Sequence, residues 1–195
     1  TLRLSARPAV VDGREMPLLR RVEAKPKRGA VKSFRLYLLR HAHAAWPSPG
    51  KRDFDRPLDE RGRREARDVA LQAFAAGIRP DRILSSPATR CAETTEIFLD
   101  VFGDLSADYD GRLYAEGVDA YLDLITAHEG PASLMIVGHN PMIEELASML
   151  ITEGPQPDEL AYGYPTAGLL ALDFDAADGS GVAGRVAGLI VPALN

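Results

Sequence analysis

Three short apolar runs, each ending in polar residues and each followed by a helical pattern, constrain the fold of this chain most. The runs cover residues 34–40, 81–85 and 133–138. Their lengths suit buried strands, and the segments between them repeat apolar residues at helical spacing. Strands that alternate with helices build a largely parallel sheet with helices packed against it. The sequence therefore predicts an α/β fold, a three-layer sandwich whose mostly parallel central sheet is flanked by helices.

Turn and capping signals predict the remaining elements. Asp59 suits the N-cap of a helix that ends at Gly77. A second helix is expected from Pro87, because proline is tolerated in a first turn, to Phe102, where Gly103 ends it. Further helices are predicted over residues 117–128 and 142–150, and late strands over residues 169–174 and 186–191.

The first 33 residues differ in charge from the rest of the chain. They contain nine Lys or Arg against three Asp or Glu, whereas the whole chain carries a net charge of −5. We expect residues 1–33 to form a basic N-terminal extension and residues 34–195 to form one domain. A solvated or self-docked extension is favoured over one that binds nucleic acid, because no aromatic residue is interleaved to stack on bases.

Composition bears on the compartment and on the partners. No apolar run approaches the roughly 18 residues of a membrane span, and no signal-peptide pattern follows the N-terminal arginines. The single cysteine, Cys91, excludes an internal disulfide. We expect a cytoplasmic protein that binds neither membrane nor nucleic acid, and the oligomeric state stays open.

Polar residues follow each of the three predicted strands where the strand ends. Arg40 and His41 follow the first strand, Ser86 to Arg90 follow the second, and His139 follows the third. The carboxyl ends of parallel strands meet at one edge of a sheet, where open α/β folds bind ligands. Two arginines, two histidines and the N-termini of helices at this edge would form an anion site suited to phosphate.

Such a site has an expected chemistry. Neutral imidazole is a competent nucleophile near pH 7, so His41 is expected to attack phosphorus in line. No acidic cluster of the kind that holds Mg²⁺ follows these strands. Arg40, Arg90 and His139 would therefore hold the phosphoryl oxygens as charge redistributes. We expect no metal and no other cofactor.

Four motifs in order resemble the histidine phosphatase (phosphoglycerate mutase-like) superfamily, and within it the short SixA-type phosphohistidine phosphatases. They are Leu39 to Ala44, Arg56-Pro57-Leu58 with Gly62, Ser85 to Thr94, and Val137 to Pro141, and they are followed by Pro165 to Gly168. The resemblance covers about residues 34–175 and implies a phosphoglycerate mutase-like fold without a metal. It also implies that His41 becomes phosphohistidine, that Arg40 and Arg90 bind phosphate, and that His139 is the second pocket histidine.

Some positions depart from the family pattern. Ala42 stands where glycine is frequent in the wider superfamily, and His43 stands where an acidic residue is frequent. We expect His43 at the pocket mouth and Ser86 in the pocket wall. Glu116 is the nearest candidate for the proton donor of larger members. The SixA-type branch often lacks a clear acid, because a phosphoramidate leaving nitrogen is itself basic.

The substrate has two candidates within this chemistry. A phosphorylated protein, such as a histidine-containing phosphotransfer domain, is favoured because the chain lacks the long insertions that close over a small substrate in large mutases. A small phosphorylated metabolite, hydrolysed by a phosphomonoesterase of the same superfamily, is the alternative.

Other chemistries are less favoured. His41 and His43 could form a metal pair, as in metal-dependent amidohydrolases, but the adjacent Arg40 disfavours a divalent cation. A non-catalytic phosphoprotein-binding module is a further alternative. Cys91 is expected to be a small buried residue, not a thiol nucleophile. His128 is expected to complement the C-terminus of a helix.

Overall fold

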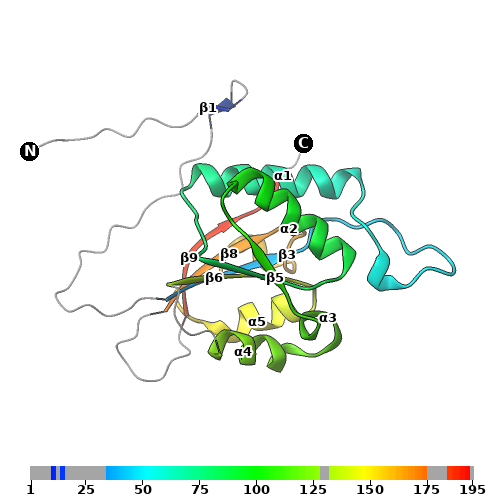
Figure 1. Cartoon of the computed structure of the whole chain (residues 1–195). Helices are drawn as coiled ribbons and strands as arrows, with labels where there is room; N and C mark the ends of the chain where they lie inside the picture. The colour runs from blue at the N-terminus through cyan, green and yellow to red at the C-terminus, as the bar shows by residue number, and fades with distance from the viewer. Residues whose placement is uncertain (1–9, 12–13, 16–33, 128–131, 175–183, 194–195) are drawn as a thin grey trace, which may run out of the picture.

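Helices cover both faces of a central sheet in the computed structural model (Figure 1). The structure describes residues 10–11, 14–15, 34–127, 132–174 and 184–193. Its strands are β1 (Val10–Val11), β2 (Arg14–Glu15), β3 (Phe34–Arg40), β4 (Arg82–Ser85), β5 (Ala107–Tyr109), β6 (Ser133–Gly138), β7 (Ile151–Glu153), β8 (Leu169–Phe174) and β9 (Gly184–Ile190). Its helices are α1 (Glu60–Ala75), α2 (Thr89–Phe102), α3 (Arg112–Ala115), α4 (Val118–Thr126) and α5 (Met142–Leu150), with short 3-10 helices η1 (Asp53–Asp55) and η2 (Asp158–Leu160).

The main sheet has the strand order β5-β4-β6-β3-β8-β9-β7. Four of its neighbouring pairs are parallel, and β8 is antiparallel to both β3 and β9. The predicted α/β sandwich with a mostly parallel sheet is confirmed. The major predicted strands and helices are present with small shifts at their ends. The short elements β5, α3 and β7 lack a periodic pattern of useful length, and the sequence did not predict them.

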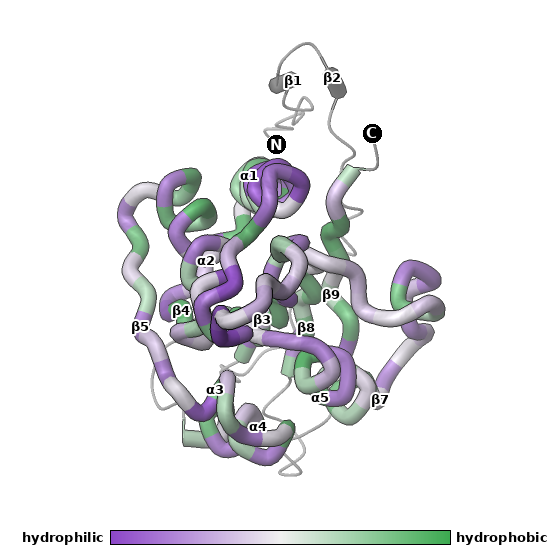
Figure 2. The backbone as a smooth tube through the Cα atoms, turned by 90° about the vertical axis from the view of Figure 1, so that its right-hand side faces the viewer, coloured by the Kyte–Doolittle hydropathy of each residue, from purple (hydrophilic) through white to green (hydrophobic). Residues whose placement is uncertain are grey.

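The central strand β3 is apolar on both faces because both faces are covered. Leu36 and Leu38 belong to the core cluster shared with α4 and α5, whereas Tyr37 and Leu39 belong to the cluster shared with α1 and α2. The side view in Figure 2 places α1 and α2 on one face of the sheet and α4 and α5 on the other. A strand buried on both faces is held firmly. It therefore supplies a rigid base for the polar residues at its end.

The helix caps follow the sequence where local chemistry decides them. The Asp59 side chain accepts a hydrogen bond of 2.8 Å from the Gly62 N–H, as expected of the N-cap of α1. The helix α4 ends at Thr126, and His128 lies outside the described residues.

The N-terminal extension is described only in part. Its β1 and β2 pair antiparallel, and most of residues 1–33 lie outside the described part of the chain. The boundary at residue 33 therefore stays a prediction. Across the described ranges, no helix is both long and apolar enough to cross a membrane.

Candidate active site

The carboxyl ends of β3, β4 and β6 meet at one edge of the sheet, as the sequence predicted. Arg40 of β3 pairs with Gly138 of β6, and the N–H of His41 donates to the Gly138 carbonyl over 3.0 Å. The N–H of Ser86 extends the β4–β6 pairing by donating to the Val137 carbonyl, also over 3.0 Å. His41 and His139 follow β3 and β6 directly, Arg40 is the last residue of β3, and Arg90 lies in the first turn of α2. The register of parallel strands therefore assembles the site.

His41 presents one nitrogen to the interior of this site. Its Nδ1 lies 2.8 Å from the Ala42 carbonyl oxygen, which can only accept, so Nδ1 carries the proton. Its Nε2 therefore bears the lone pair, and it accepts a hydrogen bond of 3.3 Å from Arg90 Nε. Burial, helped by the charges of Arg90, Arg40 and Arg56, lowers the pKa of His41 from 6.5 to about 4. The ring is thus neutral near pH 7, and Nε2 is a free base.

Arg40 is anchored through the backbone. Its Nη1 donates to the carbonyl oxygen of Tyr164, and its Nε is buried without a hydrogen-bond partner among the residues that the structure describes. Tyr164 is itself fixed, because its hydroxyl donates to the Leu38 carbonyl over 2.7 Å and accepts from the Leu170 N–H over 3.2 Å. Both partners lie in the sheet. The guanidinium is therefore tied to the core by a neutral acceptor.

Arg90 is anchored by a carboxylate instead. Its side chain is only 6% exposed. Arg90 is the second residue of α2, whose N-cap is Ala88. Nη1 donates to the backbone carbonyl of Asp53 over 2.8 Å, and Nη2 donates to its Oδ2 over 2.9 Å. These contacts hold the pKa of the Asp53 carboxyl below its usual value, against the opposing effect of its partial burial. The sequence did not single out Asp53.

His139 lies across the pocket from His41. The two ring centroids are 5.2 Å apart and the rings meet edge to face. His139 Nε2 is 2.8 Å from Ser86 Oγ, so the buried Ser86 contacts this ring as expected of the pocket wall. Burial, followed by the electrostatic effects of the nearby His41 and Arg90, lowers the pKa of His139 to about 3. This second histidine is also neutral near pH 7, and it can act there as a hydrogen-bonding group.

Arg56 is a third cation that sequence reasoning did not assign. Its Nε lies 3.1 Å from Asp53 Oδ1, and its charge helps to lower the pKa values of both His41 and His139. The motif Arg56-Pro57-Leu58 contained the signal, but no periodic pattern shows that this loop returns to the ends of the strands. The edge of the sheet thus gathers three guanidinium groups around two neutral imidazoles, an arrangement that favours a multiply charged anion.

Comparison with known proteins agrees with this geometry. A family model described as "Histidine phosphatase superfamily (branch 1)" matches residues 36–116. A crystal structure from Agrobacterium tumefaciens, provisionally named phosphohistidine phosphatase SixA, is 42% identical with a TM-score of 0.73, and the match covers 82% of this chain and 98% of that one. The chain belongs to the histidine phosphatase superfamily.

Two further relatives extend this result. The protein histidine phosphatase SixA, solved in complex with tungstate, is 25% identical with a TM-score of 0.66, over 82% of this chain and 97% of that one. An uncharacterised chloroplastic protein of Arabidopsis thaliana is 36% identical over 60% of this chain, and the match spans 59% of its own length. Membership of the histidine phosphatases, together with the SixA neighbours, supports a phosphatase activity.

His43 forms hydrogen bonds that hold the turn after β3 in this histidine phosphatase site. Its Nδ1 is 2.7 Å from Asp59 Oδ2, and its backbone N–H donates to Glu65 Oε2 over 3.1 Å. Glu65 also accepts from Thr166 Oγ1 over 2.8 Å and from Arg61 Nε over 2.7 Å. One buried carboxylate therefore joins the turn after β3, helix α1 and the loop before β8. Since the two nitrogens of His41 contact Ala42 and Arg90, the geometry does not favour a metal pair of His41 and His43.

The short helix α3 contributes an aromatic residue to the pocket. Tyr114 packs edge to face on His139, with ring centroids 5.6 Å apart, and on Phe54, with centroids 5.0 Å apart. Glu116 is exposed just after α3, where it interacts electrostatically with Arg112. Its role as a proton donor stays a prediction.

Cys91 lies beneath the pocket. It is fully buried, and its Sγ is 3.4 Å from His139 Nε2. Burial raises the pKa of this thiol to about 12, so the nucleophilic thiolate is scarce near pH 7. The expected role as a small buried residue agrees with this environment. In the part of the chain that the structure describes, no three His, Cys, Asp or Glu side chains gather as a candidate metal site.

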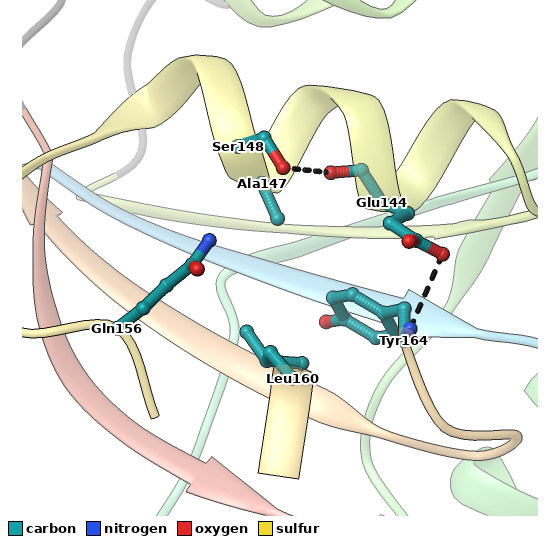
Figure 3. A pocket seen from close by; sticks show the side chains of 6 residues that line it. All are labelled: Glu144, Ala147, Ser148, Gln156, Leu160 and Tyr164. Carbon is teal, nitrogen blue, oxygen red and sulfur yellow. Dashed lines mark hydrogen bonds between the residues drawn. The ribbon is translucent and has the colours of Figure 1, made fainter. Parts of the chain in front are cut away.

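A separate small pocket lies behind the anchor of Arg40. Glu144, Ser148, Gln156 and Tyr164 line it together with Ala147 and Leu160 (Figure 3). Glu144 accepts from the Tyr164 N–H over 3.2 Å and from Asn140 Nδ2 over 2.7 Å. Glu144 therefore links Tyr164, which anchors Arg40, to Asn140, which follows His139. The residues that line this pocket thus help to hold the active site in place.

Proposed function

We propose that this histidine phosphatase removes phosphoryl groups from phosphohistidine residues of proteins, through a phosphohistidine formed on His41 and without a metal. The observation that carries the proposal is the state of His41. Its ring is neutral, its Nδ1 proton is held by the Ala42 carbonyl, and its Nε2 lone pair faces the Arg90 guanidinium. A nucleophile that is neutral and oriented toward an anion site needs no further activation.

The first step transfers the phosphoryl group to His41. The phosphoryl oxygens are bound by Arg40, Arg56, Arg90 and His139. The hydrogen bond that Arg90 Nε–H donates to His41 Nε2 is replaced by one to a phosphoryl oxygen, and Arg90 keeps its proton. This exchange frees the lone pair at the moment when phosphorus is in place. The bond between Nε2 and phosphorus forms as the bond from phosphorus to the substrate imidazole nitrogen breaks. The leaving nitrogen keeps its electron pair and takes a proton from water, since imidazole is sufficiently basic.

The second step hydrolyses the phosphoenzyme. Water attacks phosphorus, the Nε2–phosphorus bond breaks, and inorganic phosphate leaves while one water proton passes to solvent. The guanidinium groups of Arg40 and Arg90 stabilise the charge on the phosphoryl oxygens in both transition states. His41 returns as the neutral imidazole, because its low pKa disfavours the protonated form.

Two facts support the choice of substrate. One SixA structure is named a phosphohistidine phosphatase and the other a protein histidine phosphatase. The second holds tungstate, a tetrahedral oxyanion like phosphate. The motifs from Leu39 to Pro141 also follow one another without a long insertion of the kind that, by the family resemblance, closes over small substrates in large mutases. A side chain of another protein therefore suits the site better than a small metabolite.

The test measures the phosphoenzyme directly. The wild-type chain, mixed with a ³²P-labelled histidine-containing phosphotransfer domain, should acquire label that is acid-labile and base-stable, and EDTA should leave turnover unchanged. His41→Ala should acquire none. Label or full turnover in that variant would contradict the mechanism. Faster turnover of small phosphate esters than of the phosphotransfer domain would contradict only the substrate.

A further inference from the structure

Asp53 contacts the pocket arginine Arg90 at two points. The Arg90 side chain is almost fully buried, whereas the side chain of Asp53 is half exposed at the rim. Two oxygens of Asp53 bind Arg90, the backbone carbonyl at Nη1 and Oδ2 at Nη2. A buried guanidinium requires a partner for its charge, and Asp53 is a carboxylate that contacts it directly.

The two Asp53 contacts occupy one edge of the Arg90 guanidinium and leave the other edge, which carries Nε, facing the position of the phosphoryl group. A guanidinium is planar, with one edge formed by Nη1 and Nη2 and another formed by Nε and Nη2. Asp53 holds the first edge, and the Nε–H of the second edge points to His41 Nε2 over 3.3 Å. Phosphorus must come within about 3–3.5 Å of Nε2 before attack. A phosphoryl oxygen therefore meets the Nε edge of Arg90 while Asp53 keeps the other.

The position of Asp53 is set by its own short helix. In η1 the Arg56 N–H donates to the Asp53 carbonyl over 3.2 Å, and the Arg56 side chain approaches Asp53 Oδ1. The neighbouring Phe54 packs edge to face on Tyr114, which packs in turn on His139. The segment that carries Asp53 is thus tied to the opposite wall of the pocket. Asp53 is placed by packing and is more than a mobile counter-ion.

We propose that Asp53 is a positioning residue, which holds the Nη1–Nη2 edge of Arg90 so that the Nε edge faces the phosphoryl group on its way to His41. The inference rests on the proposed function, because it assigns a direction to the arginine of that same reaction. It separates two properties of Arg90. The charge belongs to the guanidinium itself, whereas its orientation depends on Asp53.

Loss of orientation should reduce kcat more than it changes KM, since misplacement affects the transition state most. We expect Asp53→Ala to lower kcat by about 30-fold while KM changes by less than about threefold. Asp53→Asn should lose less, about fivefold, because its amide oxygen still accepts from Nη2. Partial rescue by asparagine distinguishes positioning from a general loss of folding.

Asp55 provides a matched control in the same 3-10 helix. Its carboxylate pairs with Arg52, whose side chain is 78% exposed, through two hydrogen bonds of 2.8 Å. Asp55→Ala removes the same charge two residues away and should leave kcat within about twofold, as expected for an exposed ion pair. Equal kcat values for Asp53→Ala and Asp55→Ala, or a loss of Asp53→Ala confined to KM, would overturn the inference.

A second readout does not depend on turnover. In ¹⁵N NMR spectra, the Arg90 Nε–H signal, assigned by its absence from Arg90→Lys, should shift when inorganic phosphate is added to the wild type and to Asp55→Ala. It should broaden or lose this response in Asp53→Ala. An unchanged response in Asp53→Ala would refute the positioning role. Failure of the wild type to form a phosphoenzyme would refute the proposed function, and the NMR comparison would still decide the role of Asp53.

Discussion

The end of β3 and the first turn of α2 each supply an arginine to the pocket, but they hold it differently. Arg40 at the first is anchored by the neutral carbonyl of Tyr164, and Glu65 and Glu144 act on it electrostatically. Arg90 at the second shares two hydrogen bonds with Asp53, one of them an ion pair. The difference suggests a division of labour. In the proposed mechanism, Arg40 contributes charge that no directly bonded carboxylate among the described residues offsets, and Arg90 contributes a directed donor.

Alanine substitutions test this division most strongly. Arg40→Ala should lower kcat/KM by about 10³-fold and Arg90→Ala by about 10²-fold, the range for removal of one hydrogen-bond donor that stabilises a transition state. The loss is smaller for Arg90 because Asp53 already offsets part of its charge. Steady-state kinetics with the phosphotransfer domain measures both.

Lysine substitutions separate charge from direction. Arg40→Lys should recover about tenfold over alanine, whereas Arg90→Lys should recover little, since a lysine has no planar edge to share between Asp53 and phosphate. An equal recovery of kcat/KM by lysine at the two positions would show that both arginines contribute in the same way, through charge alone or through direction alone.

Backbone support of the β3 end is tested at Gly62. A Cβ at Gly62 would lie 1.8 Å from the His43 carbonyl oxygen, so Gly62→Ala must displace the turn after His41. We expect it to lower the free energy of unfolding by about 2–3 kcal/mol. Gly111→Ala is the control, because a Cβ there meets nothing within 4 Å, and it should change stability by less than about 0.5 kcal/mol. Equal urea midpoints for the two variants would contradict the close packing.

The low pKa values of His41 and His139 predict how stability depends on pH. Both rings are neutral in the folded protein down to about pH 4 and 3, whereas in the unfolded chain they take up protons below about 6.5. Stability should therefore be lost as pH falls from about 6.5, by of the order of 1–2 kcal/mol per histidine at pH 5. Urea unfolding at pH 7 and 5 measures this loss. The His139→Gln variant should lose about half as much free energy of unfolding between pH 7 and pH 5 as the wild type. A loss equal to that of the wild type would show that His139 does not cause the pH dependence.

The smallest effect is expected at Cys91, next to Arg90 in the second region. Cys91→Ala should keep activity within about twofold, because the buried thiol is protonated and is not required by the proposed mechanism. Its stability should fall by about 1 kcal/mol for the small cavity. A loss of activity beyond 100-fold would instead indicate a thiol mechanism.

Much of the fold was predictable because it depends on local pattern. The apolar run from Leu36 to Leu39, the N-cap Asp59 and the glycine after Phe102 each act within a few residues, and the elements they predict are present. The strands β5 and β7 are too short to show a period, so only their sheet partners reveal them.

The predicted core of the site follows from the same logic. Each residue of this core, Arg40, His41, Arg90 and His139, ends a strand, follows one or begins a helix, and parallel strands bring such positions to one edge. Their roles stay predictions, but their proximity required no information beyond the order of elements.

The tertiary structure alone decided what surrounds this core. The contacts of Asp53 with Arg90 and with Arg56, the packing of Tyr114 on His139, and the exposure of Glu116 depend on how loops fold back onto the sheet. Loop paths have no repeating hydrophobic signal, because they depend on side-chain pairs far apart in the chain. The sequence by itself therefore determined which groups can react, and only the folded loops determined how those groups are oriented.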